Sequence, residues 1–300
     1  MSASLVNQRA HLIDRAMRSV FFCCGAFSVF ITLGIVAVLV TEAIPFFSNV
    51  SVFTFLTDTE WTPLFFEKRF GILPLLCGTL LTSLIAMSIA LPAGITVGVY
   101  LSEFAAPGVR KVIKPILEVL AGVPTLVYGY FALFVVTPLL RSVIPELPGF
   151  NALSAGLVMG MMILPLVASL SEDAIFAVPK ALKEGAYALG SSKMQTTMKV
   201  VVPAASGGII AAVILALARA VGETMIVAIA AGQQPTLTFN PISAVETMTA
   251  YIVQVSLGDT PHGTLEFHTI FAVGLALFTI TLILNSVSLM VRKRMLRGHG

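Results

Sequence analysis

The chain has 300 residues, of which 57% are hydrophobic and only 11% are charged, and its mean hydropathy is +0.96. These values fall outside the range of water-soluble globular domains. The net charge of +3 is small, and the sequence has no stripe of basic and aromatic residues of the kind that binds nucleic acid. The composition therefore indicates an integral membrane protein and excludes a nucleic-acid-binding one.

Six apolar stretches are long enough to cross about 30 Å of hydrocarbon, which takes about 20 helical residues. They cover residues 20–44, 71–101, 112–140, 152–178, 204–231 and 267–291. The first stretch is too long for a signal-peptide core and no small-residue cleavage site follows it, so we expect it to remain as a membrane anchor. Since neither an internal repeat nor a low-complexity linker divides the chain, we predict a single all-α membrane domain over residues 1–300.

The distribution of lysine and arginine predicts the orientation, because these residues are retained on the cytoplasmic side. Fourteen of the 18 cluster at the two termini and in two alternate connections. These are Arg9, Arg15, Arg18, Arg110, Lys111, Lys114, Lys180, Lys183, Lys193, Lys199, Arg292, Lys293, Arg294 and Arg297. With both termini in the cytoplasm, only Lys68, Arg69 and Arg141 lie outside.

Two segments on the predicted outer side are longer than a hairpin connection needs. Residues 45–70 contain the only tryptophan, Trp61, among phenylalanines 53, 55, 65 and 66, which predicts an interfacial aromatic belt. Residues 232–266 contain no lysine or arginine, and Ala244 to Leu257 has the apolar spacing of a short helix. Within the fourth stretch, Gly156 and Gly160 form a small-xxx-small pair that predicts close packing on another helix.

Arg219 is the one basic residue predicted to lie deep inside a membrane helix, where a charge marks a candidate functional site. Glu223 follows four residues later, so one continuous helix would place both on one face with Ala212, Ala216, Ile226 and Ala230. One interpretation is a structural ion pair. The other is a station at which the guanidinium binds an oxyanion while the carboxylate keeps the binding weak enough for release.

The remaining charges and potential ligands favour ordinary roles. We expect Glu118 to pair with Lys114 at a helix end, and Glu172, Asp173, Glu103 and Glu42 to be solvated or docking charges. No metal site is expected, because Cys23, Cys24 and Cys77 lie inside predicted helices and the four histidines are scattered. No GxxxxGK[ST] phosphate loop is present, so any ATP hydrolysis would have to occur on another subunit.

The polar segment 180–203 separates two apolar stretches and has many small residues that allow close approach of a partner. Gly190 is suited to the left-handed turn that ends its first helix. By spacing, the segment resembles the EAA loop of ABC-importer permeases, in which a short cytoplasmic helix fits a groove on the ATPase. The residues that carry this resemblance are Glu184, Gly185, Ala186, Gly190, Val200, Val202 and Pro203.

Further segments are similar to the C-type permease subunit of the phosphate-specific ABC importer. They are WTP at Trp61, FGILP at Phe70, GT at Gly78, YLSEF at Tyr100, KPILEVLAGVPTLVYGY at Lys114 and ARAVGETM at Ala218. The resemblance implies a type I importer permease fold and assigns Arg219 and Glu223 to the substrate pathway. It also implies four partners: a related second permease subunit, an ATPase dimer that binds ATP and Mg, a phosphate-binding protein outside, and the lipid of a bacterial plasma membrane.

Three classes of function stay open at this point. An ABC permease subunit is inactive without its ATPase, and its substrate could be phosphate, sulfate, molybdate or phosphonate. A self-contained secondary transporter would more naturally have inverted repeats, and a membrane scaffold or sensor would not need Arg219 and Glu223. Phosphate is favoured among the anions because hydrogen phosphate has a hydroxyl that a carboxylate such as Glu223 can accept, whereas sulfate has none.

Overall fold

The computed structural model describes the backbone of residues 2–297 and the side chains of residues 14–290. This part of the chain is almost entirely helical, with η marking π-helical turns. The elements are α1 (Ser2–Asn49), α2 (Val52–Thr57), α3 (Leu73–Val99), η1 (Tyr100–Phe104), α4 (Pro107–Ala121), α5 (Thr125–Phe131), η2 (Ala132–Val136), α6 (Thr137–Arg141), α7 (Ala152–Phe176), α8 (Lys180–Ala188), α9 (Lys193–Thr196), η3 (Thr197–Val201), α10 (Val202–Val221), α11 (Met225–Ala230), α12 (Met248–Leu257) and α13 (Leu265–Arg297).

Among the described residues, five helical segments are long and apolar enough to cross a membrane, and a bent pair of helices makes up to six. The five are Asp14–Asn49, Leu73–Phe104, Ala152–Phe176, Lys193–Val221 and Leu265–Met290. The chain is therefore a multi-pass membrane protein, and the prediction of an all-α fold is confirmed.

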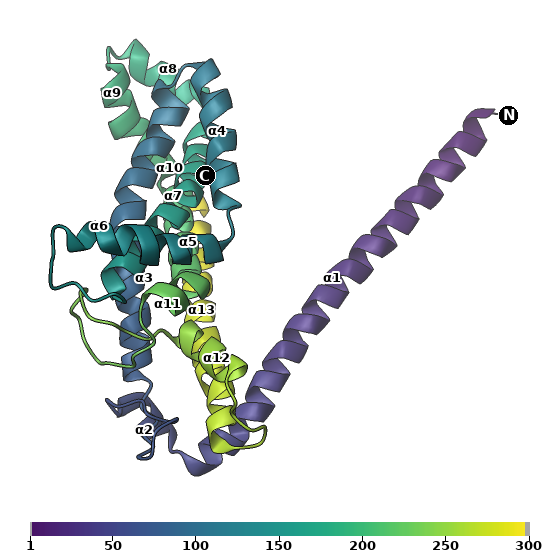
Figure 1. The fold of residues 1–300 in the computed structure, drawn as a ribbon. Helices are drawn as coiled ribbons and strands as arrows, with labels where there is room; N and C mark the ends of the chain where they lie inside the picture. The colour runs from purple at the N-terminus through teal and green to yellow at the C-terminus, as the bar shows by residue number, and fades with distance from the viewer. Residues whose placement is uncertain (1, 298–300) are drawn as a thin grey trace.

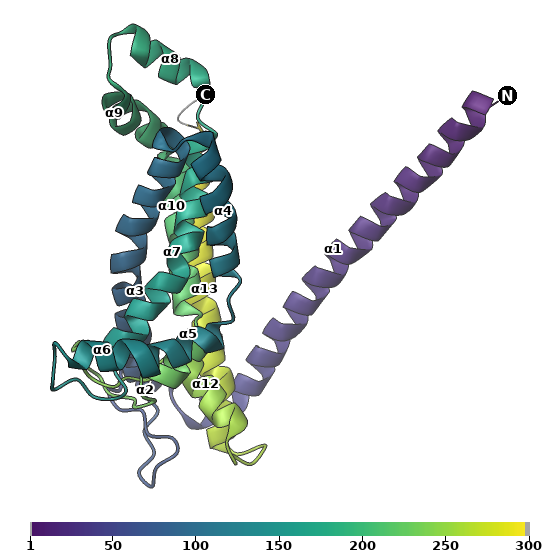
Figure 2. The ribbon, with the colours of Figure 1, turned by 45° about the horizontal axis from the view of Figure 1, so that its top comes forward.

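Helices α3, α4, α7, α10 and α13 run alongside one another, with α8 and α9 at one end and α2 and α12 at the other (Figure 1). We call these the α8 end and the α12 end. Helix α1 leaves the bundle at the α12 end and diverges from it in both views (Figure 2). It contacts α13 near that end, and the apolar window of its span is not buried by the rest of the chain.

The centre of the bundle is the pair α3 and α7, which pack closely through glycines. A Cβ added to Gly156 or Gly160 of α7 would lie 2.7 or 2.8 Å from atoms of α3, so the predicted close packing is confirmed. On the other side of the interface, a Cβ on Gly94 or Gly98 of α3 would lie 2.7 or 2.9 Å from α7. Small residues on both helices thus let the backbones approach along most of their length.

The prediction of one continuous helix over residues 112–140 is wrong. Helix α4 ends at Ala121, and the chain resumes at Thr125 after a bend of 85°. Pro124 explains the break, because it lacks an N–H and disfavours helical geometry in Val123 before it. The hydroxyl of Tyr128 donates to the Leu120 carbonyl at 3.0 Å and adds to the bond that this carbonyl accepts from the Val123 N–H at 3.3 Å.

The predicted helix over residues 204–231 is also interrupted. Helix α10 ends at Val221, a turn follows at residues 222–224, and α11 begins at Met225. Helix α5 crosses the bundle beside α11 (Figure 1), and a Cβ on Gly129 of α5 would lie 2.8 Å from the Ile229 side chain of α11. The helices that follow the two interruptions, α5 and α11, therefore pack against each other.

At the α12 end, the predicted aromatic belt is only partly correct. Phe53, Phe65 and Phe66 are exposed, but Trp61 is only 1% exposed and packs edge-on against Tyr251, with ring centroids 5.0 Å apart. Trp61 is thus a core residue that joins segment 45–70 to α12. The predicted short helix over 244–257 forms as α12 from Met248 onward, where the Thr247 side chain caps it.

Glu246 precedes α12 and supplies a prediction about pH. Its side chain is 2% exposed, its Oε1 atom has no hydrogen-bond partner, and burial raises the pKa of its carboxyl to about 8. In the folded protein this carboxyl keeps its proton to a higher pH than it does in the unfolded chain. Its contribution to the free energy of unfolding is therefore lost as the pH rises through 8.

The substitution Glu246→Gln puts a neutral side chain in this place. It should raise the melting temperature of the detergent-solubilised protein at about pH 8.5 more than at about pH 5, because only the glutamate loses its proton at the higher pH. Asp259→Asn, at an exposed position nearby, should show no such trend. A shift for Glu246→Gln that is the same at both pH values would contradict the buried, protonated carboxyl.

Candidate functional site

Two regions carry the residues that the sequence singled out. The first is the turn between α10 and α11, with Arg219 and Glu223. The second is the segment 180–203, which contains α8, α9, η3 and the start of α10.

Glu223 lies in the turn and acts as the N-terminal cap of α11. Its Oε1 accepts from the backbone N–H groups of Met225 at 3.1 Å and Ile226 at 3.3 Å. A carboxylate is well placed there, because the N–H groups that begin a helix lack internal partners and the helix dipole favours negative charge. The Glu223 carbonyl accepts from the Thr249 hydroxyl at 2.6 Å, which ties the turn to α12.

Arg219 is exposed on the isolated subunit, in the last turn of α10. Its Nη2 lies 3.7 Å from Met162 Sδ, a weak acceptor in the middle of α7. No ion pair joins it to Glu223, although the structure describes both side chains. The predicted shared face is therefore wrong beyond Val221, because the helix ends there and redirects Glu223 towards α11.

This geometry excludes the structural ion pair as an explanation for Arg219. At the depth that the sequence predicts for Arg219, a charge costs about 3 kcal/mol or more, so an arginine with only a thioether contact would need another partner there. The planar guanidinium can bind two oxygens of an oxyanion at once. The turn of residues 222–224 beside it breaks the apolar surface of the bundle and supplies polar groups at the same level.

Segment 180–203 forms the predicted helix-turn-helix and projects beyond the bundle (Figure 2). Gly190 has φ of +82° and follows α8, so its predicted left-handed turn is confirmed. Its N–H donates to the Tyr187 carbonyl at 2.9 Å, and that of Ser191 donates to the Ala186 carbonyl at 3.1 Å. These bonds satisfy carbonyls at the end of α8.

The remaining residues of the predicted coupling loop fall on two elements, α8 and α10. Glu184 and Gly185 are exposed on α8, Ala186 is buried beneath them, and Val202 and Pro203 open α10. A Cβ added to Gly185 or Gly190 meets no atom within 4 Å. This surface is therefore unoccupied by the chain itself.

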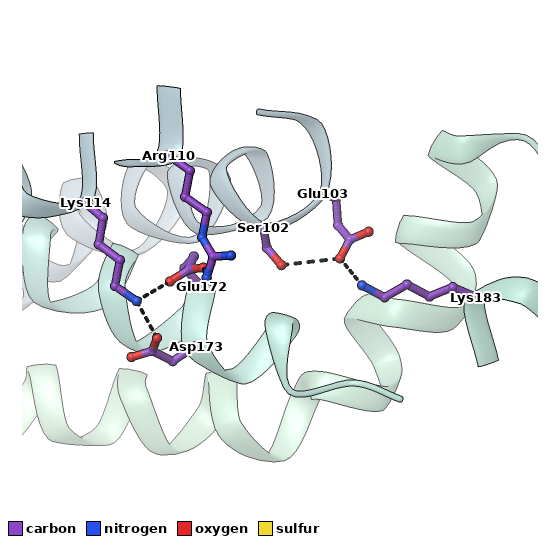
Figure 3. Close-up of polar contacts among 7 residues, drawn as sticks. All are labelled: Ser102, Glu103, Arg110, Lys114, Glu172, Asp173 and Lys183. Atoms are coloured by element: carbon purple, nitrogen blue, oxygen red, sulfur yellow. Dashed lines mark hydrogen bonds and ion pairs between the residues drawn. The ribbon is translucent and has the colours of Figure 1, made fainter. Parts of the chain in front are cut away.

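Ion pairs between distant elements surround the base of this segment (Figure 3). Lys114 of α4 pairs with Glu172 at 2.7 Å and with Asp173 at 2.6 Å, and Arg110 also pairs with Glu172. The expected pair of Lys114 with Glu118 is thus wrong. So is the expectation of a solvated Glu172, whose side chain is 1% exposed.

Glu103 of η1 and Lys183 of α8 form another pair that the sequence did not predict, at 2.5 Å. Glu42 likewise lies 3.5 Å from His268 of α13. These partners lie 58 to 226 residues apart, so no local spacing connects them. Only the placement of Arg110, Lys114 and Lys183 on the same predicted side hinted at them.

All three cysteines lie in helices, as the sequence predicts. Cys23 and Cys24 are exposed on α1, and Cys77 is a buried thiol that donates to the Thr238 carbonyl at 3.1 Å. No group of three or more His, Cys, Asp or Glu that could hold a metal occurs within the described part of the chain.

Comparison with known proteins agrees with a transport permease of this architecture. Residues 90–297 match the family described as binding-protein-dependent transport system inner membrane components. The MetNI methionine ABC transporter in an inward-facing conformation shares the fold, with a TM-score of 0.55 at 17% identity, covering 75% of this chain and 94% of that one.

Closer relatives are known from sequence. A probable ABC transporter permease protein, YqgH of Bacillus subtilis, is 35% identical over 78% of this chain and 75% of its own length. The phosphate transport system permease protein PstC of Mesorhizobium japonicum is 34% identical, over 79% and 77%. That of Pasteurella multocida is 30% identical, over 91% of each chain.

Helical spans, an exposed loop between two of them and a polar turn inside the bundle define a membrane permease. The chain belongs to the family of binding-protein-dependent transport system inner membrane components.

Proposed function

We propose that this chain is a permease subunit of an ATP-driven importer that takes inorganic phosphate from a binding protein outside and passes it to the cytoplasm. The observation that carries the proposal is the similarity, at 30–34% identity over most of the chain, to phosphate transport system permease proteins. The exposed Arg219 beside an interruption of α10 supports it, because an anion needs a positive group on its path through the bilayer.

The chain itself is proposed to be a transport subunit and not an enzyme. The energy would come from ATP with Mg bound to a dimer of partner ATPases, and a related second permease subunit would complete the pathway. The α8 end would face the cytoplasm of a bacterium and the α12 end the outside. Both termini would then be cytoplasmic; Arg9 and Arg294, on which that orientation partly depends, lie outside the residues whose side chains are described.

The exposed surface of α8 supports docking of the ATPase. Glu184 and Gly185 face away from the bundle, and no side chain of the subunit covers Gly185 or Gly190. A helix with small residues on its open face can enter a groove and bring its backbone close to the partner.

Glu223 supports phosphate over sulfate as the substrate. Its Oε1 takes both backbone bonds from α11, which leaves Oε2 able to accept the hydroxyl of hydrogen phosphate. Sulfate has no proton to donate at neutral pH. Arg219 would bind the charged oxygens of either anion.

The substrate is tested by ATP hydrolysis of the complex purified with its co-expressed partners, in lipid nanodiscs with the binding protein. We expect phosphate to stimulate hydrolysis and equal concentrations of sulfate or molybdate to have no effect. Stimulation by sulfate or molybdate but not by phosphate would overturn the proposed substrate and leave the permease fold intact.

Arg219→Gln should lower phosphate uptake by about 30-fold or more, because the anion would lose its charged partner in the bilayer. Arg219→Lys keeps the charge without the fork and should retain part of the uptake. Both are measured in proteoliposomes at equal amounts of assembled complex. Glu223→Gln keeps a side-chain oxygen that can accept from the first N–H groups of α11. This variant therefore measures how much the negative charge of Glu223 contributes to transport. Uptake by Arg219→Gln near the wild-type rate would remove Arg219 from the pathway.

Gly185→Trp should uncouple hydrolysis from transport by blocking the groove of the partner. A Cβ added at this exposed helical position meets no atom of the subunit within 4 Å, so the fold should be unaffected. Gly190 is less suitable, because its φ of +82° strains any larger residue. We expect reduced co-purification of the ATPase and a loss of phosphate-stimulated hydrolysis. Normal coupling in Gly185→Trp would show that α8 is only a connector.

A further inference from the structure

Helix α8 faces the bundle through two residues. Of its nine residues, all described, seven are exposed and only Lys183 and Ala186 are not. These two lie three positions apart and so share one face of the helix. Apart from the chain connections at its ends, a force applied to α8 reaches the bundle through this face.

Lys183 reaches across to η1, which continues the helical span of α3. Its Nζ lies 2.5 Å from Oε1 of Glu103, whose side chain is only 6% exposed. The Ser102 hydroxyl donates to the same oxygen at 3.3 Å (Figure 3). Removing one partner of such a pair leaves a charge in a largely buried place, so the pair has a larger effect than a solvated one.

The second helix of the loop contacts the same turn. Lys193, at the start of α9, places its Nζ 5.2 Å from the ring centroid of Phe104, the residue next to Glu103. This is a favourable cation–π distance. Both helices of segment 180–203 therefore attach a lysine to η1, a π-helical turn of the kind often found at functional sites.

From η1 the connection continues into the bundle. Residues Leu73–Phe104 form one helical span, and Gly98 of α3 packs against α7 beside Glu172. Further along α7, Met162 contacts Arg219. Close contacts therefore run without a gap from η1 through α3 and α7 to Arg219.

We propose that the Glu103–Lys183 ion pair is the link through which movement of α8 reaches α3 and α7. The pair positions α8 and touches no substrate. The inference rests on the proposed docking of an ATPase at α8. It adds to that function a specific pair of residues whose loss would separate hydrolysis from the bundle without preventing assembly.

A set of charge variants tests the link in the purified complex in nanodiscs with binding protein, ATP and inorganic phosphate. The variants are Lys183→Met, Glu103→Gln, the neutral double variant, the exchanged pair Lys183→Glu with Glu103→Lys, and the control Arg18→Met. Arg18 forms an exposed pair with Asp14 on α1, away from the loop. The readouts are ATPase co-purification, basal hydrolysis and the stimulation of hydrolysis by phosphate.

At equal assembly, each single variant should lower the stimulation about tenfold, and the neutral double variant should be no worse than either single one. The exchanged pair should recover to within about twofold of the wild-type stimulation. Arg18→Met should leave the stimulation unchanged.

Wild-type stimulation in Lys183→Met or Glu103→Gln would overturn the link. Recovery in the neutral double variant would also overturn it, since the pair would then serve only to neutralise a buried charge. If the exchanged pair fails to assemble, the comparison of Lys183→Met, Glu103→Gln and their double variant decides. Losses of stimulation that add up in the double variant would contradict the proposal that the two residues act as one pair. If sulfate instead of phosphate stimulates the complex, only the proposed substrate is refuted. The stimulation of each variant relative to the wild type is then measured with sulfate.

Discussion

The structure depends on one constraint: inside hydrocarbon every backbone N–H and C=O must find a partner within the protein. Continuous helices meet it for most of the chain, so each departure from helix inside the bundle needs its own solution. At the bend after α4, the Tyr128 hydroxyl satisfies the Leu120 carbonyl. At the turn after α10, the Glu223 carboxylate satisfies the first N–H groups of α11.

Satisfying these groups has a functional consequence. The helices that follow the two interruptions, α5 and α11, pack closely through Gly129, beside the turn at residues 222–224. Arg219 lies at this level with only the sulfur of Met162 as a neighbouring acceptor. The side chain that caps α11 belongs to the same turn, and the Glu223 carbonyl, which accepts from Thr249, connects this turn to α12. The arrangement suits an anion that needs polar contacts and must also be released.

Much of the fold was predictable because hydropathy and glycine are local signals. Apolar length located the spans, and the Gly190 turn and the Gly156–Gly160 contact followed from the absence of a side chain. The two breaks were missed because proline and glycine are common in unbroken membrane helices, so Pro124 and Gly222 were ambiguous. Arg219 was found by its position. The prediction that it shares a helix face with Glu223 assumed one continuous helix, whereas α10 ends at Val221. Pairs such as Glu103–Lys183 depend on tertiary contacts that spacing along the chain cannot reveal.

The central claim is that the turn at residues 222–224 lies on the path of phosphate. It is tested most directly by thiol reactivity of Thr224→Cys, a substitution of similar size that leaves Arg219 intact, after Cys23, Cys24 and Cys77 are replaced. In the assembled transporter, we expect a water-soluble thiol reagent to modify position 224 and phosphate under turnover to change the rate. Ala220→Cys, at a position only 3% exposed, should stay unreactive. An inert thiol at position 224, or one whose rate of modification is indifferent to phosphate in a transporting complex, would contradict the account.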